Sequence, residues 1–210
     1  MPSTLKVFYQ NVFHHLKTTG SIAPSSRFLA EAMVKHVKHP GAPLRILEAG
    51  PGTGPFTKRI AALIDGQDHL DLCELNDQFV EHLRRLIQVH PDLNRHQAQI
   101  EIHHKPVQEL AGENRYDYII SGLPFNNFEP ELVREILEGY QRLLKPEGTL
   151  SFFEYAGIRA IKPCITYGRE KIRVKAVDGV LNQFLTQYEK ERIFVLLNLP
   201  PSIVHVCRFQ

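Results

Sequence analysis

The residues with the clearest potential for chemistry are a glycine-rich segment and the acids on either side of it. Glu48-Ala-Gly-Pro-Gly-Thr-Gly54 places three glycines directly after a short apolar run. Glycine accepts positive φ and lets a ligand approach the backbone closely, and the free N–H groups of a following helix attract polar or anionic groups. We therefore expect a polar ligand to lie across this loop.

A second acid, Glu74, ends the next apolar run, about 20 residues beyond the loop, where a carboxylate can accept hydrogen bonds from both hydroxyls of a ribose. Its alternative interpretation is a solvated strand end. The loop lacks the G-x-G-x-x-G spacing typical of dinucleotide enzymes, and Pro51 removes one backbone donor. Glycines alone also occur in simple tight turns, so the combination with both acids indicates a nucleoside ligand.

These segments resemble motifs of the class I S-adenosylmethionine-dependent methyltransferases, namely LEAGPGTG at 47–54 and CELN at 73–76. The resemblance implies S-adenosylmethionine as cofactor and S-adenosylhomocysteine as product. Glu48 would contact the methionine part and Glu74 the ribose. It also implies cofactor contacts from the glycine loop and the ends of the following strands: Gly50, Gly52, Gly54, Phe56, Leu75, Val107, Gln108, Ser121, Gly122 and Leu123. At the adenine position Gln108 stands in for the usual acid, and core packing remains the alternative for Val107.

Further segments resemble the bacterial phospholipid N-methyltransferases. They are Ile22-Ala-Pro-Ser-Ser-Arg27, the SGLPFNNF turn at 121–128 with Glu129, and the stretch 198–205, NLPPSIVH. That family methylates phosphatidylethanolamine stepwise toward phosphatidylcholine, and related members act on ornithine lipids. The resemblance therefore implies a membrane lipid amine as acceptor.

A different class of enzyme remains open, because SGLPFN also resembles the Asn-Pro-Pro-aromatic motif of amino methyltransferases that hold a nucleobase. An rRNA adenine N6-dimethyltransferase relative is this rival. Such enzymes usually carry an additional helical domain, which we do not find before Gln210, so we favour the lipid. A membrane-binding module that keeps the cofactor only as a structural ligand is a third alternative.

Methyl transfer to an amine needs a neutral nitrogen, so a headgroup ammonium titrating near about 10 must first lose its proton. Tyr155 and Asn126 are the candidates to accept or orient that proton, and Tyr155 could equally be a core residue. Phe125 and Tyr155 could also cradle the methylated ammonium through cation–π contact, and Pro124 in the same turn is expected to contact the headgroup. Cations that could hold the lipid phosphate follow the fifth strand: Arg159, Lys162, Arg169 and Lys171.

The charge distribution points to an anionic partner, although the net charge is only +2. Residues 1–45 hold six Lys or Arg against one acid, and residues 157–177 hold six against one. Residues 1–20 also show an apolar helical face, formed by Leu5, Phe8, Val12, Phe13 and Leu16. Such a helix with basic flanks can lie in a bilayer interface, or it can dock on its own core. We expect a monomer, peripheral on the cytoplasmic face of the cell membrane, that binds anionic lipid rather than nucleic acid.

The elements expected to position these residues alternate along the chain. Apolar runs predict strands at 44–49, 69–74, 100–103, 116–121 and 149–155, and 3.6-residue periodicity predicts helices at 56–64, 79–87, 132–144 and 180–188. A turn is expected at 145–148, and two last strands, 193–199 and 203–209, are joined through Pro200-Pro201-Ser202 as an antiparallel hairpin. Ser25 and Ser26 are N-cap candidates for a helix at 27–37, and by the resemblance this helix start covers the methionine carboxylate.

This order predicts an α/β fold: a Rossmann-like class I methyltransferase sheet, mostly parallel with a C-terminal antiparallel strand, helices on both faces and an amphipathic N-terminal helix. Residues 21–210 would form the catalytic domain and 1–20 the membrane helix. The composition, 43% hydrophobic and 23% charged, is that of a globular chain and excludes disordered and collagen-like classes. Cys73, Cys164 and Cys207 lack metal-ligand spacing, so we expect no metal and no disulfide framework.

Overall fold

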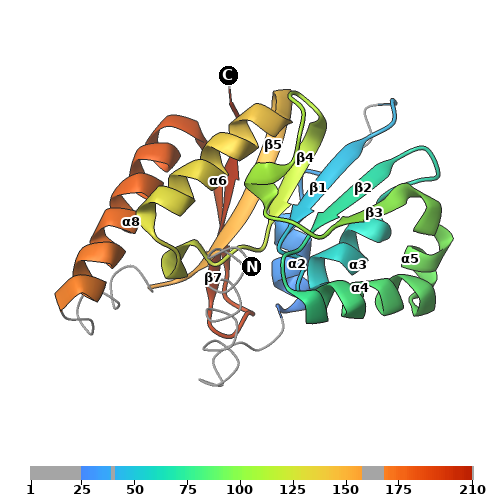
Figure 1. The fold of residues 1–210 in the computed structure, drawn as a ribbon, viewed down its shortest axis with the longest axis horizontal. Helices are drawn as coiled ribbons and strands as arrows, with labels where there is room; N and C mark the ends of the chain where they lie inside the picture. Colours follow the sequence, from blue (N-terminus) through green and yellow to red (C-terminus); the bar gives the residue numbers. More distant parts are fainter. Residues whose placement is uncertain (1–24, 39–40, 158–167, 210) are drawn as a thin grey trace, which may run out of the picture.

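The fold is built on one seven-stranded sheet, seen in a computed structural model that describes residues 25–38, 41–157 and 168–209 (Figure 1). The strand order is β3-β2-β1-β4-β5-β7-β6, with β1 to β5 parallel and β7 antiparallel to both of its neighbours. The strands are β1 Arg45–Ala49, β2 His69–Cys73, β3 Ile100–His103, β4 Tyr116–Ser121, β5 Leu144–Tyr155, β6 Glu189–Val195 and β7 Ser202–Cys207. The predicted mostly parallel sheet with an antiparallel C-terminal strand is confirmed.

Helices cover both faces of the sheet, because each strand of a parallel sheet exposes apolar side chains on two sides. The helices are α2 Arg27–Met33, α3 Pro55–Ala61, α4 Asp77–Val89, α5 Pro91–Arg95, α6 Pro130–Leu143 and α8 Gly168–Tyr188. Helices α6 and α8 share one apolar core with β4 and β5, and α2, α3 and α4 share the other with β1 and β2. Short 3-10 turns occur at Gln97–Gln99, Val107–Glu109 and Phe125–Asn127.

The carboxyl ends of the parallel strands meet at one edge of the sheet, where ligands bind in open α/β folds. The loops after β1, β2 and β4 all lie there, as does the last residue of β5, Tyr155. Strand β6 is antiparallel to β7 and therefore runs in the same direction as β5, so the β6–β7 connection at 196–201 ends at this edge as well. The edge therefore collects the glycine loop, Glu74, the SGLPFN turn and this connection.

Several predicted bounds are wrong, for identifiable reasons. Helix α2 ends at Met33 rather than at residue 37, and residues 145–148 do not form a separate turn but lie within β5, where Glu147 has φ 65° and the register against β4 shifts. Helix α8 begins at Gly168, well before the apolar stripe used to predict it. The strand predicted at 193–199 is β6, which ends at Val195, because the leucines that follow are exposed in the connection.

Some sequence predictions fall on residues that lie outside the described ranges. These are the amphipathic face of residues 1–20, Arg159, Lys162 and Cys164. Among the helices that the structure does describe, none is both long and apolar enough to cross a bilayer.

Candidate cofactor and acceptor site

The glycine loop after β1 packs directly against the turn after β4. Gly50 has φ 69°, and a Cβ at this position would come within 2.6 Å of Leu123 Cδ2. A Cβ on Gly122 would stand 2.7 Å from the backbone oxygen of Gly50, closer than a real Cβ approaches another atom. Gly52 has φ 56°, and no atom lies within 4 Å of where its Cβ would be. The loop therefore packs tightly on the side of β4 and leaves space for a ligand at Gly52.

Glu74 lies just beyond β2 and its carboxylate spans the turn. It accepts hydrogen bonds from the backbone N–H groups of Gly52 at 3.1 Å, Leu75 at 2.8 Å and Asn76 at 2.9 Å. Burial raises the pKa of Glu74, and these three backbone donors oppose part of that rise. The carboxylate is thus fixed beside the glycine loop, as a ribose contact requires, and the solvated alternative is wrong because Glu74 is buried.

Glu48 is fully buried in β1, and neither of its carboxylate oxygens has a hydrogen-bond partner among the described residues. Burial raises its pKa to about 8, and the charge of Glu74 raises it further. The hydroxyl and backbone N–H of Thr57 in the first turn of α3 are near enough to lower it in part, without the geometry of a full hydrogen bond. An orphaned buried acid costs free energy unless a ligand satisfies it. A cationic ammonium such as that of S-adenosylmethionine fits this position, so the residues present are compatible with that cofactor.

A small pocket at the carboxyl edge lies between the glycine loop and Glu74. Its lining includes Gly50, Glu74, Leu75, Val107 and Leu123, as the sequence predicts for a cofactor site. Lys105 and Pro106 also line the pocket, and Lys105 is a contact that sequence reasoning missed. Its only signal is its place shortly after the third strand.

Gln108 stands beside the pocket rather than in its lining. Its Cα and Cβ lie 3.5 and 3.7 Å from where a Cβ on Gly139 of α6 would be, and its side-chain oxygen is buried without a hydrogen-bond partner in the described part of the chain. Its role at the adenine therefore stays a prediction.

Three predicted contacts point into the protein instead of the pocket. The Ser121 hydroxyl accepts a hydrogen bond from Tyr140 at 2.8 Å inside the core, and the cofactor contact of this residue stays a prediction. Phe56 is buried beneath the loop, where its ring meets that of Phe153 edge-on at 5.9 Å. Phe125 is 2% exposed and packs edge-on against Phe128 and Phe152, because an aromatic ring gains more by burial than by facing water. The ring of Phe125 is therefore buried in this structure, and its contact with the methylated ammonium stays a prediction.

The two catalytic candidates lie at the same edge. Asn126 is in the turn after β4, and its backbone oxygen accepts a hydrogen bond from Arg173 of α8 at 3.3 Å. Tyr155 is the last residue of β5, and burial raises the pKa of its phenol. Pro124 precedes the 3-10 turn and is partly buried. Their contact with a substrate stays a prediction.

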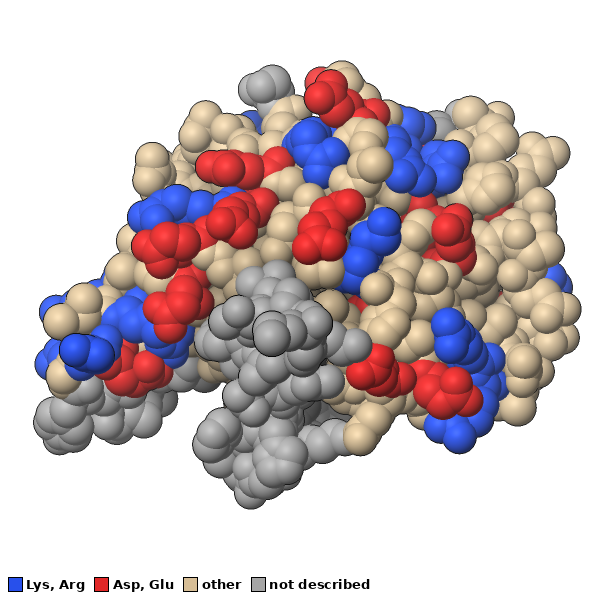
Figure 2. Space-filling view, viewed as in Figure 1, with Lys and Arg blue, Asp and Glu red and all other residues tan. Residues whose placement is uncertain are grey.

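Two predicted phosphate-binding cations stand on the first turns of α8. Arg169 and Lys171 are exposed, and Arg173 ties this helix end to the SGLPFN turn by donating to the Phe128 backbone oxygen at 2.5 Å. Figure 2 shows blue basic atoms gathered at this end of the molecule, interrupted by red acidic ones.

The start of α2 is connected to the β6–β7 connection. Ser26 is the N-cap and its hydroxyl accepts a hydrogen bond from Leu29 N–H, which confirms one of the two N-cap candidates; Ser25 precedes the cap. The backbone N–H of Ser26 donates to Asn198 Oδ1 at 2.9 Å. Asn198 thus stands at the edge of the site, and its only signal in the sequence is its place in the stretch 198–205.

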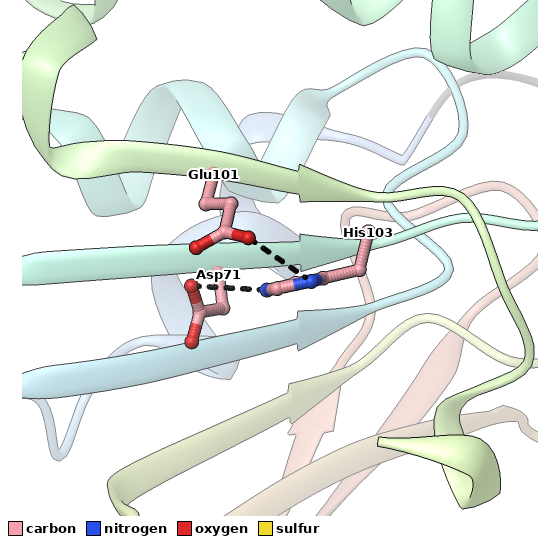
Figure 3. Close-up of side chains that lie close together, drawn as sticks. All are labelled: Asp71, Glu101 and His103. Atoms are coloured by element: carbon pink, nitrogen blue, oxygen red, sulfur yellow. Dashed lines mark ion pairs between the residues drawn. The ribbon is translucent and has the colours of Figure 1, made fainter. Parts of the chain in front are cut away.

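The only three-residue group with metal-ligand types in the described residues is Asp71, Glu101 and His103 on β2 and β3 (Figure 3). His103 Nε2 lies 3.2 Å from Asp71 Oδ1, and its Nδ1 lies 3.5 Å from Glu101 Oε1. Asp71 Oδ2 already accepts a hydrogen bond from Tyr116 at 2.6 Å and faces two arginines, Arg45 and Arg115. Two guanidinium groups would repel a bound cation, so we interpret the group as an ion-pair network between strands.

The sequence of the chain matches known proteins in the same region as this site. Residues 46–148 match the family model described as "Methyltransferase domain". An ornithine lipid N-methyltransferase from Singulisphaera acidiphila is 26% identical over 96% of this chain and 94% of its own length. A tRNA1(Val) (adenine(37)-N6)-methyltransferase from Dyadobacter fermentans is 30% identical, but over only 50% of this chain and 48% of its own length.

The fold matches as well. The structure of 1,6-didemethyltoxoflavin-N1-methyltransferase from Burkholderia thailandensis, solved with S-adenosylhomocysteine, has a TM-score of 0.64. It is 15% identical and covers 97% of this chain and 86% of its own length. At this identity the likeness shows a shared fold. Together with the family match and the orphaned Glu48 beside the glycine loop, it assigns S-adenosylmethionine to this site.

Proposed function

We propose that this chain, which contains a class I S-adenosylmethionine-dependent methyltransferase domain, transfers methyl groups to the primary amine of a membrane lipid headgroup. An ornithine lipid is the first choice of acceptor. The observation that carries this proposal is the similarity to an ornithine lipid N-methyltransferase over 96% of the chain, which includes the β6–β7 hairpin as well as the cofactor site. Phosphatidylethanolamine is the second choice, supported by the resemblance of 22–27, 121–128 and 198–205 to the phospholipid enzymes.

An apolar loop at the carboxyl edge supports a lipid acceptor. Leu196, Leu197 and Leu199 are 76%, 67% and 78% exposed in the β6–β7 connection. Leaving three leucines in water is unfavourable, and such exposed apolar groups often mark an interaction site. Their place at the same edge as the cofactor site suits an enzyme whose substrate is embedded in a bilayer.

The connection is held in a defined shape. Asn198 Nδ2 donates to the Pro200 backbone oxygen at 2.8 Å and to Ser202 Oγ at 2.9 Å, while its Oδ1 accepts from Ser26. These bonds fix the polar residue inward and leave the leucines on either side pointing out. Arg169 and Lys171 at the start of α8 add positive charge for an anionic lipid surface at the same edge.

The reaction asks little of the protein beyond alignment, because S-adenosylmethionine supplies the activated methyl carbon when bound. Glu48, Glu74 and the glycine loop hold the cofactor side. The SGLPFN turn and the end of β5 border the acceptor side, where the amine must arrive without its proton and without competing water.

The test offers ornithine lipid, phosphatidylethanolamine and RNA in one reaction with radiolabelled S-adenosylmethionine, and then separates the products. We expect label in the lipid extract, most of it in the ornithine lipid. Label in phosphatidylethanolamine alone would exchange the first acceptor for the second. Label in RNA alone would overturn the lipid proposal in favour of the adenine N6 chemistry of the Dyadobacter relative.

A further inference from the structure

A buried histidine connects two carboxylates across the last three strands of the sheet. His205 of β7 is 3% exposed; its Nδ1 lies 2.5 Å from Glu189 Oε1 of β6 and its Nε2 lies 3.2 Å from Glu154 Oε2 of β5. Glu154 is itself 6% exposed, and the Phe152 ring lies against the imidazole, tilted by 31° with ring centroids 5.0 Å apart. The cofactor site as described above uses none of these three residues.

The two distances indicate where the proton of this cluster lies. A neutral imidazole donates from one nitrogen and accepts at the other. The short contact to Glu189 is that of a charge-assisted donor, so the proton is assigned to Nδ1. In that tautomer the longer contact sets the Nε2 lone pair against the Glu154 carboxyl group, and two acceptors 3.2 Å apart attract each other only through a proton shared between them. The pair formed by Glu154 and His205 therefore favours binding a proton between its facing atoms.

Glu189 is suited to hold that tautomer in place. Burial acts to raise its pKa, but hydrogen bonds from Arg192 and His205 outweigh this and lower it, so Glu189 stays an anion. Arg192 Nη2 lies 2.7 Å from Glu189 Oε2. Cys207 lies two residues further along the same strand, and burial raises the pKa of its thiol, so it brings no charge to the imidazole at neutral pH.

Glu154 lies at the carboxyl edge on the acceptor side. Its strand neighbour Phe152 pairs with Ser121, so Glu154 stands two residues further along, level with the start of the LPFN turn. Phe152 and Phe125 are in ring contact at 5.4 Å on the same face of the sheet as Glu154. Glu154 is thus the one buried carboxylate of β5, and it stands at the edge of the sheet where the LPFN turn lies.

We propose that Glu154 is the base that binds the substrate ammonium and takes its proton, and that His205, fixed by Glu189, is a positioning residue that shares this proton. The proposal rests on the lipid-amine function stated above. In the step, an N–H bond of the ammonium breaks and its electron pair stays on nitrogen. A bond to the proton forms on Glu154, which shares it with His205 Nε2, so that the imidazole becomes an imidazolium between two carboxylates.

The test compares wild type with Glu154→Gln and His205→Gln in pH profiles of kcat and KM for lipid methylation. Loss of a general base typically costs about 10²–10⁴-fold. We expect a fall of that size in kcat at pH 7 for Glu154→Gln, with partial recovery toward about pH 10 as the amine loses its proton to water. His205→Gln should lower kcat less and shift the profile in the same direction. Tyr116→Phe, which removes a hydrogen bond to the other buried carboxylate cluster at Asp71, is the matched control and should keep the wild-type profile.

A second readout does not depend on turnover. Nitrogen NMR shifts of His205 should report the Nδ1–H tautomer in the free chain, and they should move when a short-chain lipid amine is added to wild type but not to Glu154→Gln. Unchanged shifts in wild type, or a Glu154→Gln profile parallel to that of wild type, would overturn the proposal. If wild type methylates no lipid amine at all, the proposed function fails, and the NMR response still decides whether Glu154 meets an ammonium. Calorimetric binding of S-adenosylmethionine checks that each variant is folded.

Discussion

At the scale of single residues, two buried acids mark the cofactor edge, and they differ in whether hydrogen-bond donors surround their carboxylates. Glu74 has three backbone donors around its carboxylate, whereas both oxygens of Glu48 lack a hydrogen-bond partner in the described residues. Glu74 is therefore already arranged as an acceptor for ribose hydroxyls. Glu48 needs a ligand to satisfy it, and a cation does so best.

Replacing Glu74 by Gln tests the ribose contact. The amide keeps the size of the side chain but loses the charge that strengthens hydrogen bonds from hydroxyls, so we expect S-adenosylmethionine to bind about 10- to 100-fold more weakly. Isothermal titration calorimetry measures the change. Glu101→Gln, on an exposed side chain of β3, is the control. Equal affinities for Glu74→Gln and wild type would remove Glu74 from the site.

The sequence predicts a residue's place in the site well when that place follows from the end of a strand. It does not predict the direction in which a side chain points. Gly50 and Glu74 are fixed by the strand ends that precede them, so their meeting follows from the order of elements. Phe125 and Ser121 stand at a predicted strand end too, yet one ring turns into the core and one hydroxyl bonds Tyr140. Glu154 was missed because its importance depends on His205, which lies 51 residues later in the chain.

At the scale of elements, the β6–β7 connection shows how an apolar run can mislead. Leu196 to Leu199 continue the hydrophobic pattern of β6, and the pattern alone predicts a longer strand. In the structure β6 ends at Val195 and these leucines are exposed. The hydrophobic periodicity of a sequence and its strand propensity indicate where a residue could be buried. Only the fold shows that no described residue covers these leucines.

The connection provides the membrane prediction. Leu196→Glu combined with Leu197→Glu places two charges where we propose bilayer contact, so sedimentation with anionic vesicles should fall at least about tenfold, because each leucine contributes roughly 1.5–3 kcal/mol on full burial. Val89→Glu is the matched control, since Val89 is 75% exposed at the end of α4, far from the carboxyl edge. Undiminished sedimentation of the double variant would reject this loop as the contact, and methylation of a detergent-dispersed lipid should persist in it.

At the scale of the whole molecule, buried acids couple the stability of the fold to pH. Glu48 has a pKa of about 8 in the fold against about 4.5 in the unfolded chain, because burial disfavours its charge. A raised pKa stabilises the fold fully below the unfolded value, and this contribution is lost as the pH rises toward 8. Glu189 acts in the opposite direction: its lowered pKa contributes stability above its unfolded value, which is lost as the pH falls. The free chain should therefore be most stable at mildly acidic pH.

Glu48→Gln tests this coupling in the free chain. The amide cannot ionise, and one pKa unit corresponds to about 1.4 kcal/mol, so the variant should gain several kcal/mol relative to wild type at about pH 8.5 and little at about pH 5. For a chain of this size that gain raises Tm by roughly 10–20 °C, measurable by differential scanning calorimetry. S-adenosylmethionine should stabilise wild type more than the variant at the higher pH, because only the ionised carboxylate attracts the cofactor ammonium. If Tm depends on pH in the same way in both proteins, Glu48 is not the buried acid that limits stability. If the cofactor raises Tm equally in both proteins, Glu48 does not contact the methionine part of the cofactor.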